Sequence, residues 1–113
     1  MSDPAKVYRV REWPRYFENS RSRVIERLSW VPIPNHHDGD RYGELLDHEA
    51  GLAHYGCWVL MVQVASKCKP RGVLLKSTGE PHTAASIARM VRGEAETFKT
   101  AMGRLLAIGW LEE

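Results

Sequence analysis

Histidines and aspartates between positions 36 and 54 are the first residues that could do chemistry, because imidazole and carboxylate groups bind divalent metals. On one helix, His48 and His54 would not share a face, since neighbours on a helix are three or four residues apart. The polar loop 35–40 has no fixed ligand geometry, so we expect no metal site. A metal-dependent nuclease would need Glu44 or His48 to meet side chains of this loop around an ion. Those loop side chains are His36, His37, Asp38 and Asp40.

Nucleophilic catalysis and nucleotide hydrolysis are also disfavoured. Cys57 lies inside the apolar run 57–62, where a thiol is more often buried than reactive. Cys68 lies eleven residues further along the same predicted helix, which is too far for a disulfide, so we expect two reduced thiols. The glycines between positions 39 and 56 lack the spacing of a phosphate-binding loop and its Lys-Ser/Thr pair. We therefore expect no catalytic residue and no cofactor, and the chain is not predicted to be an enzyme.

The basic residues are grouped along the chain, which suits a polyanionic partner. The net charge is only +2, and the isoelectric point is about 8.7. Within residues 67–92, however, six lysines and arginines stand against a single acidic residue, Glu80. Residues 31–60 have the opposite balance, with Arg41 against five aspartates and glutamates. A solvated basic surface without a ligand is the alternative explanation of the basic block.

The length and composition indicate one compact domain. The chain has 113 residues, of which 43% are hydrophobic and 27% charged. Its longest uninterrupted apolar run is six residues, whereas a membrane-spanning helix needs about 20. The N-terminus has no basic segment followed by an apolar one, as a signal peptide would. We expect a cytoplasmic protein with no membrane partner.

Three helices are predicted in the second half of the chain. The first is apolar nearly all round, which is typical of a helix at the centre of a fold. Thr83 is a good N-cap for the second, and Gly109 favours a left-handed end to the third. Their ranges are Gly51 to about Lys67, Thr83 to Val91, and about Glu94 to Ile108. Arg92-Gly93 separates the last two helices.

Short strands complete this half. Val73 to Leu75 is too short for anything but a strand, and Trp110 to Glu113 is predicted to form a second strand that pairs with it. Trp58 and Trp110 lie in apolar patterns and are expected in the core.

The N-terminal third is predicted to be an extension, residues 1–34, ahead of the main domain, residues 35–113. It contains a short strand at Val7 to Arg11, a helix from Asn19 or Ser20 to Leu28, and an extended proline segment from Trp30 to Pro34. A short helix from Tyr42 to His48 follows. Trp13 and Trp30 are expected to anchor the extension, and stacking on single-stranded bases is the functional alternative. The extension could also be a dimerisation arm, because its strand needs a sheet edge.

The order of elements from residue 50 to 113 resembles the winged helix-turn-helix family. The resemblance rests on Ile87-Ala88-Arg89-Met90, then Thr97-Phe98-Lys99-Thr100-Ala101-Met102, then Arg104-Leu105 and Gly109-Trp110-Leu111. With its N-terminal extension, the layout also resembles the N-terminal domains of phage replisome organisers and DnaD-type replication initiation proteins. The resemblance implies an α+β, mainly helical fold in which a three-helix core carries a small β-sheet.

This resemblance implies binding of double-stranded DNA, with the helix from Glu94 to Ile108 in the major groove. If Phe98, Met102 and Leu105 face the core, the exposed side holds residues able to contact phosphates or base edges. These are Glu96, Thr97, Lys99, Thr100 and Arg104. The residues expected to hold the flanking DNA backbone are Lys76, Ser86, Arg89 and Arg92.

Replication initiation in a phage or bacterium is the biological setting that the resemblance suggests, with transcription regulation next. Replication proteins and a second copy of the chain are further partners to consider. The alternative function is a winged-helix protein-interaction module without DNA contact. It is favoured by Glu94 and Glu96 in the first turn of the recognition helix, which complement the helix dipole but meet phosphates badly. The sequence ends at Glu113, where a wing hairpin would turn, so either it is part of a longer protein or the wing is missing. A missing wing would leave fewer phosphate contacts and so would also favour this alternative.

Overall fold

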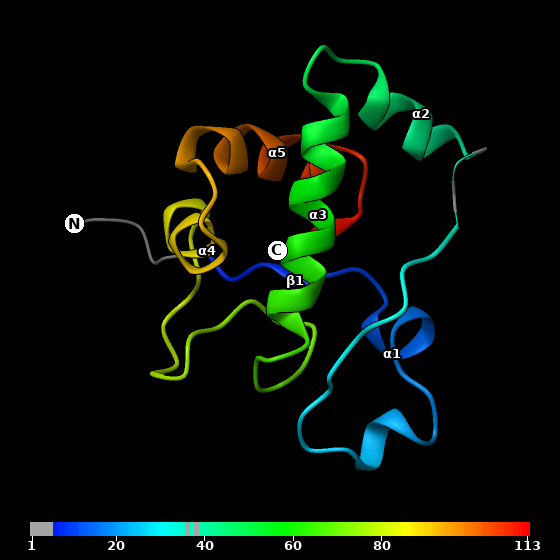
Figure 1. Ribbon diagram of the computed structural model, residues 1–113, viewed down its shortest axis with the longest axis vertical. Helices are drawn as coiled ribbons and strands as arrows, with labels where there is room; N and C mark the ends of the chain where they lie inside the picture. The colour runs from blue at the N-terminus through cyan, green and yellow to red at the C-terminus, as the bar shows by residue number, and fades with distance from the viewer. Residues whose placement is uncertain (1–5, 36, 38) are drawn as a thin grey trace.

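A computed structural model describes residues 6–35, 37 and 39–113, and it is an α+β, mainly helical structure. Helix α3 runs through the centre of the view in Figure 1, with α4 and α5 on one side of it and α1 and α2 on the other. In chain order the elements are β1 (Arg9–Val10), α1 (Trp13–Tyr16), the 3-10 helix η1 (Ser22–Val24), α2 (Asp40–Leu46), α3 (Gly51–Ala65), α4 (Ala84–Val91), α5 (Ala95–Ala107) and β2 (Leu111–Glu112).

The core surrounds α3, as its apolar composition predicts. Met61 and Val62 of α3 are completely buried. Five segments around α3 each contribute a fully buried aliphatic side chain. Each such side chain stabilises the fold by about 1.5–3 kcal/mol relative to an exposed one. These side chains are Leu45 of α2, Leu74 in the loop after α3, Ile87 of α4, Leu105 of α5 and Leu111 of β2.

Helix α4 begins where its capping residue predicts. The backbone N–H of Ser86 donates to Oγ1 of Thr83 at 3.1 Å, and the backbone N–H of Thr83 donates to Oγ of Ser86 at 2.7 Å. This reciprocal pair satisfies two N–H groups that the first turn of a helix leaves unpaired. The helix ends at Arg92, whose φ of 62° is left-handed.

The turn between α4 and α5 is short, and it brings the backbone of Gly93 close to the side chain of Phe98. A Cβ at Gly93 would lie 2.5 Å from the ring of Phe98, so only glycine fits without displacing that buried ring. Helix α5 then ends at Gly109, which has φ of 80°. The N–H of Trp110 donates to the carbonyl of Leu105 at 3.0 Å, and the N–H of Gly109 donates to that of Leu106 at 3.1 Å, which is a Schellman motif. The predicted left-handed cap is confirmed.

The prediction for the strands is wrong in its pairing. β2 pairs with the N-terminal strand β1, with Val10 opposite Leu111, and not with residues 73–75. β1 meets that segment on its other side through an isolated bridge between Arg9 and Val73. The N-terminal strand therefore lies between the two segments that were predicted to pair, and its sheet edge is supplied by its own chain.

The segment from residue 6 to 17 belongs to the same core as α3. Val10, Trp13 and Phe17 are buried with the core residues, and a Cβ at Gly72 would lie 2.5 Å from the side chain of Trp13. Gly72 has φ of 90°, so it combines a left-handed turn with the close approach of the indole. Part of the predicted extension is thus built into the domain.

The predicted helix from residue 19 to 28 is absent, and only η1 forms there. Oδ1 of Asn19 accepts the backbone N–H groups of Arg21 and Ser22 at 2.9 Å each, which is a local turn that competes with a helix. Ile25 is extended and exposed. Trp30, which was predicted to be an anchor, is 79% exposed.

Candidate nucleic-acid interface

Helices α4 and α5 form a packed pair with a short turn between them. Ile87 and Ala88 are the buried residues of α4, and α5 buries the face predicted from its spacing. The buried residues of α5 are Phe98, Ala101, Met102 and Leu105. Because this face packs on α4 and α3, the opposite face of α5 is exposed within the part of the chain that the structure describes.

The outer face of α5 consists of short side chains flanked by a lysine. Thr100, Gly103 and Ala107 are exposed along it, with Glu96 at its N-terminal end and Lys99 at its side. A Cβ at Gly103 would meet no atom of the described chain within 4 Å. Glycine inside a helix costs about 0.5–1 kcal/mol relative to alanine. No packing contact within the described residues explains that cost, whereas close approach of a partner would.

The N-terminal end of α5 carries two glutamates, Glu94 and Glu96, but the side chain of Glu94 does not cap the helix. Glu94 occupies the N-cap position, yet its side chain caps no backbone N–H. Its Oε1 instead accepts a hydrogen bond from the hydroxyl of Thr97 at 3.1 Å. Thr97 is half-buried, so its hydroxyl is directed to Glu94 rather than to a partner. Glu96 remains exposed, where it complements the helix dipole.

Arg104, predicted on the exposed side, is half-buried and held inside the protein. One guanidinium nitrogen donates to Nδ1 of His54 at 2.7 Å, and the other donates to the carbonyl oxygen of Glu44 at 2.8 Å. These bonds tie the C-terminal half of α5 to α2 and α3. We therefore leave Arg104 out of the candidate interface.

His54 must be neutral to serve this network. Arginine is always a donor, so Nδ1 of His54 must carry the lone pair and Nε2 the proton. Burial, followed by electrostatic interaction with Arg104 and His48, lowers the pKa of His54 below its ordinary value. His54 is therefore a structural acceptor and is not free to act as a proton carrier.

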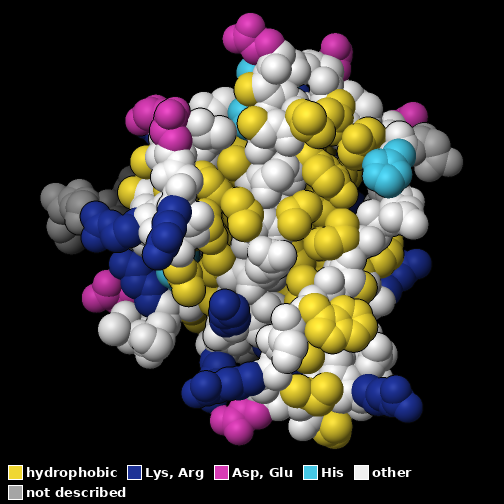
Figure 2. Space-filling model, viewed as in Figure 1, with side chains coloured by type: hydrophobic (Ala, Val, Ile, Leu, Met, Phe, Trp, Pro, Cys, Tyr) yellow, Lys and Arg dark blue, Asp and Glu magenta, His cyan; other side chains and the backbone are white. Residues whose placement is uncertain are grey.

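Three cations near α5 make no ion pair with any described residue. They are Arg89 near the end of α4, Arg92 in the turn and Lys99 on α5, and all three are exposed. Figure 2 shows lysine and arginine side chains gathered along the edge of the molecule where Figure 1 has α4. The same view shows acidic side chains above that cluster. Cations without an acidic partner are available to bind phosphates.

Lys76 lies in the turn that precedes α4, and Ser86 lies in the first turn of α4. Lys76 is half-buried, and its Nζ lies 4.0 Å from Oε2 of Glu80. Because this ion pair is exposed to solvent, it contributes little to fixing the lysine side chain. The hydroxyl of Ser86 bonds Thr83 in the capping box and lies 2.9 Å from Nδ1 of His82. Ser86 is thus occupied in fixing the helix, while Lys76 keeps a partly free ammonium group.

Metal and thiol chemistry find no support in residues 6–35, 37 and 39–113. No three His, Cys, Asp or Glu side chains gather there as a metal site would require. His36 and Asp38 of the predicted loop lie outside the described residues. The rings of His48 and His54 lie 4.9 Å apart, contrary to prediction, because His48 precedes α3 rather than sharing a helix with His54. Cys57 and Cys68 are free and buried, and burial raises the pKa of both thiols.

Comparison with family models, curated proteins and solved structures finds no match for this chain. None of the helices in the described part of the chain is long and apolar enough to cross a membrane.

Two features of the molecule were missed by reasoning from sequence. One is the hydrogen bond between Arg104 and His54, which are fifty residues apart, so no local pattern could connect them. The other is an aromatic cavity between β1, α2 and α3, in which residues from both halves of the chain meet. The density of aromatic residues at positions 13–17 and 55–58 was the available signal for it.

Proposed function

We propose that this protein binds double-stranded DNA through the outer face of α5, with α4 and the turn at Arg92 beside the DNA backbone. The pairing of α4 with α5 across a left-handed turn is the arrangement expected of a helix-turn-helix. A winged version of this fold is part of the same proposal, and it rests on the resemblance of residues 50–113 to that family.

The open position at Gly103 is the observation that supports this proposal best. Together with Thr100, it gives α5 a low outer surface that a groove of DNA can approach closely. In this arrangement the hydroxyl and methyl of Thr100 reach base edges, and Lys99 contacts a phosphate. Arg89 and Arg92 contact the flanking phosphates. Glu96 accepts a hydrogen bond from a cytosine amino group.

The biological setting we propose is replication initiation in a phage or bacterium, with transcription regulation as the second setting. Both rest on the resemblance described above. A cytoplasmic location follows from either setting, because the DNA is there.

The test measures binding of a fluorescently labelled duplex by anisotropy. The double variant Arg92→Gln/Lys99→Gln removes two proposed phosphate contacts, and we expect affinity to fall about tenfold or more at moderate salt. The matched control, Arg23→Gln/Arg27→Gln, removes the same charge from a groove lined by α1 and the loop after α3. Equal losses in both variants would mean that only net charge matters and that α5 is not the interface.

A protein-interaction module is the second candidate, and one observation favours it. Met90 on α4 is 53% exposed, next to the cation Arg89 and near the acidic start of α5. An exposed methionine suits an apolar pocket on a protein better than a phosphate backbone. If the duplex does not bind at low salt, Met90→Lys becomes the variant to use in a search for a protein partner.

A further inference from the structure

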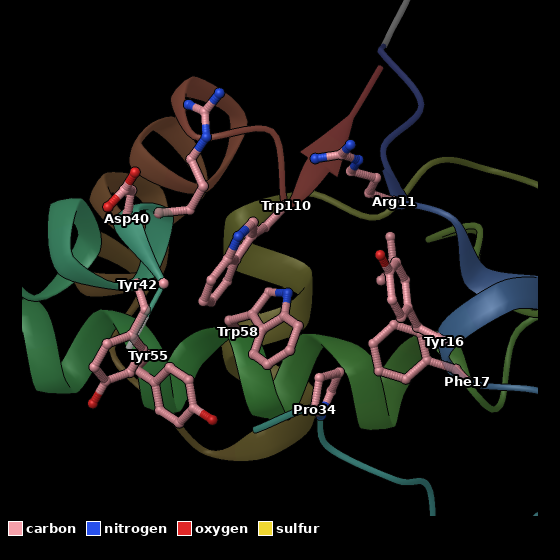
Figure 3. A pocket seen from close by; sticks show the side chains of 12 residues that line it. Arg11, Tyr16, Phe17, Pro34, Asp40, Tyr42, Tyr55, Trp58 and Trp110 are labelled. Carbon is pink, nitrogen blue, oxygen red and sulfur yellow. The ribbon is translucent and has the colours of Figure 1, made fainter. Parts of the chain in front are cut away.

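A second site lies outside the pair formed by α4 and α5. It is a cavity of about 280 Å³ whose lining comes from β1, α1, α2, α3, the segment before α2 and Trp110, with no residue from α4 or α5. Figure 3 shows these side chains converging from separate parts of the chain. This volume is just below the range of about 300–1,000 Å³ for small-molecule pockets, so the cavity suits a single planar ring system rather than a larger ligand.

The walls are mainly aromatic. The rings of Trp58 and Trp110 lie 4.7 Å apart and tilted, and Tyr55 lies 5.7 Å from Trp58. Phe17 meets Trp58 edge-on at 6.2 Å, and Tyr16 lines the cavity beside it. Figure 3 shows Tyr16 and Phe17 facing the two tryptophans across the space. Flat, polarisable walls of this kind favour a planar aromatic ligand.

The cavity has one buried donor that nothing satisfies. Trp58 is only 6% exposed, and its indole nitrogen is the one buried side-chain nitrogen or oxygen in the described residues without a hydrogen-bond partner. In Figure 3 the nitrogen edge of the ring faces the space between Trp110 and Tyr16. A buried indole N–H usually has an acceptor. A ligand that fits this cavity should therefore carry an acceptor on the edge of its ring.

The rim carries two arginines and one aspartate. Arg11 and Arg41 line the cavity with exposed guanidinium groups. Each has an acidic neighbour on the surface, Glu12 at 3.5 Å and Glu44 at 3.8 Å, and exposed pairs at such distances are weak. A negatively charged group outside the ring would therefore find two cations. Asp40 on the same rim can accept from an exocyclic amino group.

We propose that this cavity binds one unpaired nucleotide. The base stacks among the aromatic walls and accepts a hydrogen bond from the indole N–H of Trp58, and the phosphate lies at Arg11 and Arg41. A purely apolar ring would offer no acceptor to the indole N–H of Trp58. A ligand without a negative charge would make no ion pair with Arg11 or Arg41. The nucleotide can come from a free pool or from a single strand, and both have the same chemistry. This site is separate from the outer face of α5, so it goes beyond the proposed duplex binding.

The test follows the indole N–H resonance of Trp58 in nitrogen-15 NMR spectra of the full chain. Its absence from the spectrum of Trp58→Phe assigns it, and that variant keeps an aromatic wall. The probes are each deoxynucleoside 5′-monophosphate, the matching nucleosides, a ten-nucleotide single strand and a duplex. Binding by Trp58→Phe is followed on the indole N–H resonance of Trp110, which lines the same cavity. We expect this variant to bind about three- to tenfold more weakly, as the loss of one hydrogen bond does. Arg11→Gln/Arg41→Gln should weaken it about tenfold or more, with Arg21→Gln/Arg27→Gln as the control of equal charge.

Each result of this experiment either supports or overturns the proposal of a nucleotide site. A saturable shift of the Trp58 resonance with mononucleotides supports the proposal with free nucleotides as the source. A shift with the single strand alone supports it with an unpaired base as the source. A shift with neither, a shift with duplex alone, or equal affinity for nucleosides and nucleotides would overturn it. Because none of these variants lies on α4 or α5, failure here is distinct from failure of duplex binding.

Discussion

Replacing Gly103 with alanine should move stability and DNA affinity in opposite directions. The residue lies inside α5 at an exposed position where a Cβ meets no described atom within 4 Å. The methyl group therefore causes no clash, and the helix gains the difference in propensity. We expect the free energy of unfolding to rise by about 0.5–1 kcal/mol. For a domain of this size, the melting temperature should rise by about 2–6 °C.

Affinity should fall because the same methyl group lies on the surface that approaches DNA. A close-packed contact that is overfilled by one carbon costs of the order of 1 kcal/mol, so we expect duplex affinity to fall at least about threefold. A merely solvated helix face would not respond in this way.

Thermal unfolding by circular dichroism and duplex binding by anisotropy give the two quantities. Gly56→Ala is the matched control, because Gly56 lies inside α3 and its Cβ also meets nothing within 4 Å. It should stabilise the protein to a similar extent and leave DNA affinity unchanged. If Gly103→Ala is more stable yet binds DNA as tightly as the parent, the outer face of α5 does not approach DNA closely and the reasoning is refuted.

Three further predictions concern the scaffold. Lowering the pH from 7.5 to 5.5 should reduce the free energy of unfolding in urea, because burial lowers the pKa of His54 and His82 in the folded protein. From about pH 6.5 downward the unfolded chain binds protons at these two histidines more readily than the folded chain does, so the free energy of unfolding falls. An unchanged free energy of unfolding between pH 7.5 and 5.5 would contradict the conclusion that both histidines are neutral in the folded protein. Gly93→Ala should destabilise the protein by about 1–3 kcal/mol, because its Cβ would lie 2.5 Å from the ring of Phe98, and a loss below about 0.5 kcal/mol in urea unfolding would contradict this. Arg104→Met should cost about 1–3 kcal/mol of stability by leaving acceptors unpaired, while duplex affinity measured well below the melting temperature stays within about twofold. A much larger loss of duplex affinity in Arg104→Met would mean that Arg104 contacts DNA after all.

The helices of the second half could be predicted because their determinants are local. Thr83 caps α4, and Gly109 closes α5 in a left-handed turn, as their residue types indicate. The apolar spacing of α5 also identified its buried face. Such signals depend on neighbours three or four residues away, and the sequence displays them directly.

The errors concern contacts between distant parts of the chain. β2 and the segment around Val73 were predicted to pair with each other, but β1 lies between them and bonds to both. Nothing in the residues of these two segments indicates that the N-terminal strand separates them. Periodicity placed Arg104 near the edge of the exposed face, where a long side chain can turn inward to His54. The cavity around Trp58 was beyond prediction for the same reason, since its walls come from β1, α1, the segment before α2, α2, α3 and Trp110.

The central claim is that α5 and its neighbouring cations contact the phosphates of duplex DNA, and salt dependence tests it most directly. The logarithm of the binding constant should fall linearly with the logarithm of salt concentration, by about 0.9 for each phosphate contacted. We expect the Arg92→Gln/Lys99→Gln variant to reduce that slope by about two relative to the parent, and the control Arg23→Gln/Arg27→Gln to leave it unchanged. An identical slope in all three proteins, or no binding at low salt, would contradict the account.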